Sequence, residues 1–302
     1  MAKLTVDQAL MRAKSHQRKD EIEQARALYK SVLDAFPNNA RARKALAQLD
    51  GPKESSSSAA GPPKDKINSL IAFYNQGQFV EATEQAETLV EQYPSSFVLW
   101  NILGSSRTRI GRKDQAIAAY QRALVIKPDF AEVYNNMGNA LLDQGKLDEA
   151  IVAYQRALAI KPDIAEAHSN MANALRDRGK LDEAIATYQH ALAIKPDFVE
   201  AHNNMGSLLQ DQGKLDEAVA AYQRALAIKP DFADAHNNMG NALQEQRKLG
   251  EAIAAYQRAI SIKPDFVEAH SNFGNVLLGQ GKLDEAIATY QHALAIKPDF
   301  AG

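Results

Sequence analysis

The feature that most constrains this chain is a short string that returns at a fixed interval. Lys-Pro-Asp, followed by Phe or Ile, occurs six times at steps of 34 residues, with its lysines at Lys127, Lys161, Lys195, Lys229, Lys263 and Lys297. A second string, Gly-Lys-Leu-Asp-Glu-Ala, keeps the same register and begins at Gly145, Gly179, Gly213 and Gly281. A period of this length predicts an array of stacked helical hairpins, in which each unit buries its apolar stripe against its neighbours.

One unit illustrates how the hairpin is expected to form. We expect a first helix over 131–144 and a second helix over 148–161. Gly145 lies just past the first helix, where a residue in the left-handed conformation ends a helix at little cost. Pro162 ends the second helix because proline cannot continue the backbone hydrogen-bond pattern. We expect the small residues Ala150 and Ala157 of the second helix to let it lie close against Gly138.

The residues between the units predict where the next helix begins. Asp163 is followed three residues later by Glu166, which is the Asp-x-x-Glu pattern of a capping box. The same pattern recurs at Asp129, Asp197 and Asp265. One unit departs, since Arg247 stands where the others have the turn glycine and Gly250 replaces the following aspartate. We expect that hairpin to be the least stable of the regular units.

These residues closely resemble the tetratricopeptide repeat (TPR) family. Within one unit the family's positions are occupied by Gly138, Gly145, Ala150, Tyr154, Ala157 and Pro162. The resemblance covers residues 97–130, 131–164, 165–198, 199–232, 233–266 and 267–300, and more faintly 63–96 and an N-terminal hairpin over 6–39. The pattern is closest to the TPR superhelix of O-linked N-acetylglucosamine transferases and to related bacterial arrays. It implies an all-α, right-handed superhelical solenoid that mediates protein–protein interaction.

The chain is predicted to divide into three parts. Residues 1–49 form a TPR-like helical hairpin plus a short helix, 50–66 a flexible Ser/Gly/Pro linker, and 67–302 an array of one divergent and six regular repeats. Residues 1–66 have a net charge of +5 and the remainder −7. A helical piece as small as the first part is marginal alone, so we expect it to pack on its own array or on another chain.

Composition and motifs argue against catalysis. The chain has no cysteine, and neither a phosphate-binding loop nor a nucleophile elbow occurs. The net charge of −2 argues against a dedicated nucleic-acid binder. No apolar run approaches the roughly 20 residues of a transmembrane helix, and no signal peptide is present, so a cytoplasmic location without membrane contact is expected. We therefore expect no enzyme activity, no cofactor and no metal.

A regular series of histidines could suggest a metal site. His168, His202, His236 and His270 recur at the same place on successive first helices. Packed helices lie about 8–10 Å apart, whereas a metal–nitrogen bond is about 2 Å long, so one ion could not join two of these positions. We expect these side chains to pack between hairpins instead.

The asparagines of the first helices form three rows that are candidates for binding. The first row is Asn136, Asn170, Asn204, Asn238 and Asn272; the second is Asn139, Asn173, Asn241 and Asn275, interrupted by Ser207; the third is Asn135, Asn203 and Asn237. Asparagine is unfavourable inside a helix, so its repetition needs a reason.

Two interpretations of these rows remain open. They resemble the asparagine ladder of the transferases, and that resemblance implies a concave groove whose amides bind the backbone of an extended peptide. Alternatively, the rows were copied with the repeats and the groove binds only water. The family's other groove ligand, a C-terminal carboxylate held by basic residues, is not expected, because the second position of each unit is acidic: Glu132, Glu166, Glu200, Asp234 and Glu268.

The last residues raise an alternative function. Asp299 would cap a helix that does not follow, and Tyr290, Leu294 and Phe300 are expected to be partly uncovered. The chain could be the N-terminal TPR module of a larger glycosyltransferase or sulfotransferase, could have a frayed end, or could be covered by another molecule. In the last case it would self-assemble into head-to-tail filaments or tubes, through these residues and an apolar N-terminal set: Leu10, Leu28, Tyr29, Leu33 and Phe36.

Overall fold

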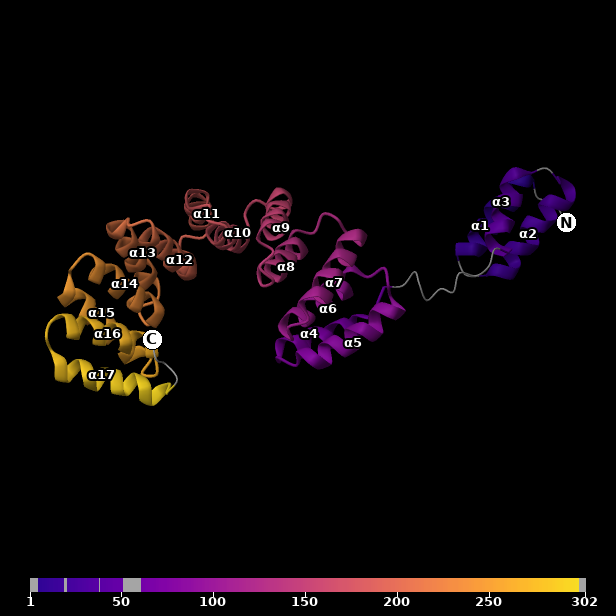
Figure 1. The fold of residues 1–302 in the computed structure, drawn as a ribbon. Helices are drawn as coiled ribbons and strands as arrows, with labels where there is room; N and C mark the ends of the chain where they lie inside the picture. Colours follow the sequence, from indigo (N-terminus) through magenta and orange to yellow (C-terminus); the bar gives the residue numbers. More distant parts are fainter. Residues whose placement is uncertain (1–4, 19–20, 38, 51–60, 299–302) are drawn as a thin grey trace. The chain divides into compact units, whose positions relative to one another are not determined.

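The computed structural model describes residues 5–18, 21–37, 39–50 and 61–298. Within these ranges the chain forms seventeen α-helices and no β-strand, which confirms the predicted all-α class (Figure 1). The helices belong to two compact units, Met1–Pro63 and Lys64–Gly302. None of the described helices combines the length and the apolar composition of a membrane-spanning segment.

The N-terminal unit contains α1 (Val6–Arg18), α2 (Ile22–Ala35) and α3 (Ala40–Asp50). Its core is small and consists of Ala9, Ala13, Ala25, Tyr29, Val32 and Ala42. The linker predicted over 50–66 is too long at both ends, because Asp50 is the last residue of α3 and the next helix begins at Lys64. Most of the remaining linker, residues 51–60, lies outside the described residues.

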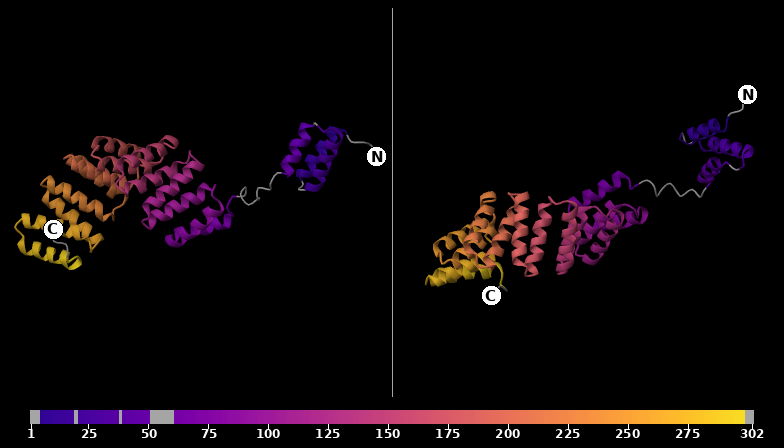
Figure 2. Two further views of the ribbon diagram at one scale, coloured as in Figure 1. Left: turned by 45° about the vertical axis from the view of Figure 1, so that its right-hand side comes forward. Right: turned by 90° about the horizontal axis from the view of Figure 1, so that it is seen from above.

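The second unit is an array of helical hairpins, in which first helices have even labels and second helices odd labels. Its helices are α4 (Lys64–Asn75), α5 (Phe79–Gln92), α6 (Phe97–Arg109), α7 (Lys113–Ile126), α8 (Ala131–Leu142), α9 (Leu147–Ile160), α10 (Ala165–Asp177), α11 (Leu181–Ile194), α12 (Val199–Asp211), α13 (Leu215–Ile228), α14 (Ala233–Glu245), α15 (Leu249–Ile262), α16 (Val267–Gly279) and α17 (Leu283–Ile296). Both views of Figure 2 show these hairpins stacked in a curved row.

The packing of the helices determines which side of this row is the inner one. Each first helix contacts its partner in the hairpin and also the first helix of the next repeat, as α8 contacts α10 and α10 contacts α12. Successive second helices make no comparable contacts in the described part of the array. The first helices are therefore closer together, and they form the concave face of the solenoid.

From α6 onward, the hairpins carry a tyrosine of the second helix opposite a small residue of the first. The hairpin α4–α5 has Leu70 and Ala86 at these places. The Tyr154 ring lies so close to Gly138 that a Cβ atom there would be 2.6 Å from Tyr154 Cε1. Tyr154, Tyr188, Tyr222 and Tyr256 are fully buried. Small residues, Ala150 and Ala157, were expected to meet Gly138, but the nearest atoms belong to the Tyr154 ring. One repeat has the fully buried Ala172 at the place of this glycine.

The predicted capping boxes are wrong. The N-cap residues of α8, α10 and α12 are Phe130, Ile164 and Phe198, one position after the aspartate, and none makes a side-chain capping bond. Phe198 instead packs against the core between hairpins, with Lys195 Nζ 4.6 Å from its ring centroid. Burying the aromatic ring and placing a cation on its face favours this start of the helix over an aspartate cap.

The turn inside each hairpin requires a left-handed residue. Gly145 has φ +72°, and Gly77, Gly111, Gly179, Gly213 and Gly281 are similar. Arg247 occupies the same place with φ +61° and is the one described non-glycine residue with positive φ. A side chain costs about 1–2 kcal/mol in this region because its Cβ crowds the following carbonyl.

We expect Arg247→Gly to raise the free energy of unfolding of the α14–α15 hairpin by about 1 kcal/mol, because it removes this backbone strain. Native-state hydrogen exchange of the amides in α14 and α15 measures the effect locally. The matched change Gly213→Arg should lower protection in α12 and α13 by a similar amount. Unchanged protection of α14 and α15 in Arg247→Gly would contradict the assignment of strain to this turn.

Candidate interaction surface

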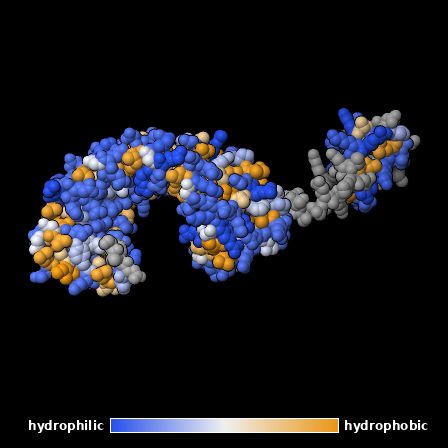
Figure 3. Space-filling view, in the orientation of Figure 1, coloured by the Kyte–Doolittle hydropathy of each residue, from blue (hydrophilic) through white to orange (hydrophobic). Residues whose placement is uncertain are grey.

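The asparagine rows lie where successive first helices meet on the concave face. Asn170 and Asn173 are three residues apart on α10, so they share one side of that helix. The members of the first row are all partly exposed, which leaves them accessible from the concave side. In Figure 3 the array is hollowed below its curve, and its surface there is mainly hydrophilic.

The second row is bonded to the buried tyrosines of the same hairpin. Tyr154 donates its hydroxyl hydrogen to Asn139 Oδ1 at 2.7 Å, and Tyr256 donates to Asn241 at 2.7 Å. Tyr188 donates to Asn173, and Tyr290 to Asn275, in the same way. These bonds explain why the row is polar, since a buried hydroxyl needs a partner.

The first row links each repeat to the preceding one. Asn170 Nδ2 donates to Asn139 Oδ1 at 3.0 Å, and Asn272 Nδ2 donates to Asn237 Oδ1 at 3.0 Å. Asn204 bonds Asn173 and Asn238 bonds Asn203 by the same pattern, at 3.4 and 3.2 Å. The side chains thus form an amide ladder along the concave face. This structural role was not foreseen from the sequence.

The ladder leaves part of its hydrogen-bonding capacity unused. Asn139, Asn173 and Asn241 accept through Oδ1, and their Nδ2 groups donate to no acceptor within the described residues. Asn170 donates through Nδ2, and its Oδ1 accepts nothing there. The third row has fewer amide groups available to a ligand. Asn203 and Asn237 are more than nine-tenths buried and bond neighbouring asparagines, while Asn135 is half-buried. The predicted peptide contact of all three rows stays a prediction.

Acidic side chains lie close to this ladder, at the ends of the first helices. Burial raises the pKa of Tyr154, Tyr222 and Tyr256, and the nearby carboxylates Asp143, Asp211 and Glu245 raise it further. The pKa of Tyr188 is raised to about 12, again mainly by burial.

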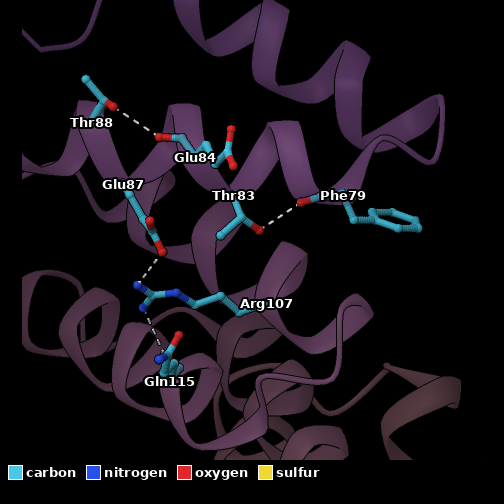
Figure 4. Close-up of polar contacts among 7 residues, drawn as sticks. All are labelled: Phe79, Thr83, Glu84, Glu87, Thr88, Arg107 and Gln115. Carbon is cyan, nitrogen blue, oxygen red and sulfur yellow. Dashed lines mark hydrogen bonds and ion pairs between the residues drawn. The ribbon is translucent and has the colours of Figure 1, made fainter.

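The three arginines of the first helices, Arg107, Arg109 and Arg176, are engaged within the chain. Arg107 occupies the column that holds buried leucine in later repeats. It donates from Nη2 to Glu87 Oε1 at 2.9 Å and from Nη1 to the Gln115 carbonyl at 3.2 Å (Figure 4). Arg176 pairs with the adjacent Asp177, and the guanidinium of Arg109 lies 4.9 Å from the centroid of the Phe79 ring. These contacts disfavour a carboxylate clamp on this face.

The histidine series has a different role from packing alone. His202 Nε2 lies 2.9 Å from the Pro196 carbonyl oxygen, and His168, His236 and His270 contact the corresponding proline carbonyls. Trp100 Nε1 donates to the Pro94 carbonyl at 2.8 Å from the same column. The sequence carries a sign of this contact, because each of these histidines and Trp100 stands six residues after a proline. The described residues contain no group of three or more metal-ligating side chains.

The residues predicted to form a head-to-tail assembly interface differ in their exposure, and the interface stays a prediction. Tyr29 is 1% exposed and belongs to the core, so its inclusion was wrong. Leu33 is half-buried against that core, Leu10 borders a hollow between α1 and α3, and Leu28 and Phe36 line a different hollow. On α17, Leu294 is 44% exposed and Tyr290 is half-buried. Asp299 and Phe300 lie outside the described residues.

Comparison with known proteins identifies the repeat. A family model described as TPR repeat matches residues 104–145, 138–176, 172–213, 206–247 and 274–302. Two models described as tetratricopeptide repeat match residues 233–266 and 10–49. Together these matches cover more than half of the chain.

Solved structures share the fold. The crystal structure of MamA is 29% identical with a TM-score of 0.51, over 55% of this chain and 96% of MamA. YrrB, described as "a TPR protein with an unusual peptide-binding site", is 22% identical with a TM-score of 0.50, over 61% of this chain and 95% of YrrB. Because the sequence identity to YrrB is only 22%, this likeness concerns the fold alone.

Curated relatives match over short stretches. The peroxisomal targeting signal receptor of Saccharomyces cerevisiae is 35% identical over 60 residues, which is 20% of this chain and 10% of the receptor. The receptor of Kluyveromyces lactis is 32% identical over 68 residues, which is 22% of this chain and 12% of the receptor. The matched segment therefore spans about a tenth of these receptors.

The buried tyrosines predict a loss of stability at high pH. An exposed tyrosine in the unfolded chain ionises near pH 10, whereas Tyr188 in the folded array ionises at about pH 12. The unfolded state therefore loses its proton first, and the stability linked to this group is present below pH 10 and lost between about pH 10 and 12.

We expect the free energy of unfolding of the array to fall across this window, and Tyr188→Phe to make the decline shallower by up to about 1.4 kcal/mol per pH unit. Urea denaturation followed by circular dichroism at pH 9, 10, 11 and 12 measures both slopes. The variant should parallel the parent below pH 9, where the group is protonated in both states. Equal slopes above pH 10 would contradict the assignment.

Proposed function

Because the chain belongs to the tetratricopeptide repeat family, we propose that it is a non-catalytic scaffold whose concave face binds an extended segment of a partner protein. The observation that carries this proposal is the unused capacity of the asparagine ladder. Second-row amides such as Asn139 and Asn173 retain N–H donors, and first-row amides such as Asn170 and Asn272 retain carbonyl acceptors. A peptide main chain offers the complementary groups in every residue.

The spacing of the repeats suits an extended ligand. Neighbouring packed helices lie about 8–10 Å apart, and an extended chain rises about 3.3 Å per residue. About three residues of ligand therefore pass each repeat. Since the ladder would bond the main chain of the ligand, it would accept many sequences. The receptors that this chain partly resembles are by name receptors for a targeting signal.

The carboxylates beside the ladder restrict which segments bind. The first helices of four successive repeats end in Asp143, Asp177, Asp211 and Glu245, all of which are exposed. An acidic ligand would be repelled by this row, whereas a neutral or basic segment would not.

The sharpest test replaces asparagine by a residue that the array already uses at the same place. Ser207 and Ser105 stand in the second row, and Tyr120 donates to Ser105 at 3.2 Å. Asn139→Ser, Asn173→Ser and Asn241→Ser together therefore keep an acceptor for each tyrosine and remove the amide donors. Each lost hydrogen bond weakens binding by about 0.5–1.5 kcal/mol, so we expect the three changes together to lower affinity by about 10- to 2,000-fold.

Peptides selected from a random 16-residue display library on the 302-residue chain serve as probes, and fluorescence anisotropy gives their Kd. The control Gln155→Ser, Gln223→Ser and Gln257→Ser changes exposed residues of α9, α13 and α15 and should leave Kd unchanged. Circular dichroism checks that both variants stay folded. Equal affinity for the parent and the asparagine variant would refute the proposal.

A second candidate function is self-assembly, which is favoured by an exposed apolar strip on α17. Leu283, Ile287 and Leu294 are 57, 54 and 44% exposed, and hydrophobic residues gather over this end of the array in Figure 3. Burying them against a second copy would gain apolar contact area.

If the strip drives assembly, the mass measured by light scattering should grow with concentration, and Leu283→Ser with Ile287→Ser should restore a mass near the 33.1 kDa of the single chain. Electron microscopy of the same samples would reveal filaments or tubes. A constant mass of the parent at every concentration would argue against this function. Because both changed residues are exposed, the variant should remain folded, which circular dichroism verifies.

A further inference from the structure

The N-terminal unit has a hollow that the proposed function does not use. It lies between α1 and α3, has a volume of about 680 Å³, and is lined on its apolar side by Leu10, Met11 and Ala45. Met11 is 67% exposed although it faces this hollow. A volume of this order lies in the range of about 300–1,000 Å³ that is usual for binding sites, and exposed methionine adapts to varied apolar partners.

The border of the hollow is cationic. Lys14, Arg41 and Lys44 line it together with a single carboxylate, Asp7. Arg41 and Asp7 are 3.8 Å apart, but both side chains are more than four-fifths exposed, so this pair contributes little. Lys14 and Lys44 make no ion pair with any described residue.

The described carboxylates packed around this site do not neutralise it. Apart from Asp7, they lie at the start of α2 or along it. Glu21 bonds His16 and Glu23 bonds Arg26, and Asp34 is near the end of α2. The helices α1 and α3 also carry Arg12 and Arg43. On α2, Arg26 and Lys30 stand beside Glu23 and Asp34, so the excess of positive charge lies on α1 and α3.

The same helix positions have opposite chemistry in the two units. When Ala25 and Tyr29 of this hairpin are aligned with Ala150 and Tyr154 of the array, Leu10, Met11 and Lys14 fall at the places of the asparagine columns. The concave side of the N-terminal hairpin is thus apolar and basic, whereas that of the array is rich in amides and flanked by carboxylates. The two surfaces cannot favour the same ligand.

We propose that the hollow between α1 and α3 binds an acidic, amphipathic segment of a partner protein. Apolar side chains of that segment cover Leu10, Met11 and Ala45, and its carboxylates meet Lys14, Arg41 and Lys44. A nucleic acid would leave the apolar floor uncovered. A flat anionic membrane would reach the cationic border and Met11, but the partly buried Leu10 and Ala45 would stay uncovered. A protein segment that combines carboxylates with apolar residues satisfies both parts of the surface.

The test uses the full 302-residue chain and the 16-residue display library. Peptides selected on the parent are screened again on Lys14→Gln, Arg41→Gln and Lys44→Gln combined. The control Lys146→Gln, Lys214→Gln and Lys248→Gln removes the same charge from exposed positions in the turns of the array. A second variant, Met11→Ser, changes the exposed apolar floor without changing charge.

We expect a set of peptides that bind the parent and the control variant but not the border variant. These peptides should be enriched in Asp and Glu and should have apolar residues three or four positions apart. A synthetic member should bind the border variant about tenfold more weakly at low salt, with the difference shrinking as salt rises. Met11→Ser should weaken the same peptide at every salt concentration. The asparagine variant of the array should leave its Kd unchanged, which separates this site from the concave face of the array.

Several outcomes would overturn the proposal. The proposal fails if no selected peptide needs the three cations for binding. It also fails if the peptides that need them are not enriched in Asp and Glu, or if the control variant loses the same peptides. Sedimentation with phosphatidylserine vesicles that the border variant abolishes would assign the surface to a membrane. Concentration-dependent mass in light scattering that the border variant abolishes would assign it to a second copy of this chain.

Discussion

From α6 onward, the contact between a second-helix tyrosine and a small first-helix residue holds the hairpins closed, and the rest of the array depends on it. The Tyr154 ring occupies space that a side chain at Gly138 would fill, so the two helices approach closely. Its hydroxyl then reaches Asn139 at the concave edge of the hairpin. One side chain thus sets the distance between the helices and orients a polar group on the surface.

The amide ladder places contacts between repeats and the proposed ligand contacts in the same side chains. A hairpin cannot bury its apolar stripe alone, so the array is only as stable as the interfaces between repeats. Asn170 and Asn272 contribute to those interfaces by donating to the preceding repeat. The hydrogen bonds compensate for the poor helix propensity of asparagine. Since the same amides retain unused groups, a ligand along the concave face would also stiffen the stack.

The two units present surfaces of opposite character from the same helix positions. In the N-terminal unit the concave side combines Leu10 and Met11 with a border of lysine and arginine. In the array it combines amides with Asp143, Asp211 and similar carboxylates. A repeat architecture permits this divergence, because the buried positions that close the hairpin are separate from the positions that face a ligand.

The sequence by itself determined the number and order of the hairpins, because the 34-residue period and the turn glycines are local signals. It also located the strained turn at Arg247, since that position demands a left-handed residue whatever surrounds it. The tertiary structure decided which polar groups meet. The bonds of Tyr154 to Asn139 and of His202 to the Pro196 carbonyl join groups from different helices or across a turn. The local pattern predicted aspartate caps, but the helices begin one residue later, where burial of residues such as Phe198 stabilises the start of the helix. Such pairings depend on how closely hairpins pack, and no local pattern contains that distance.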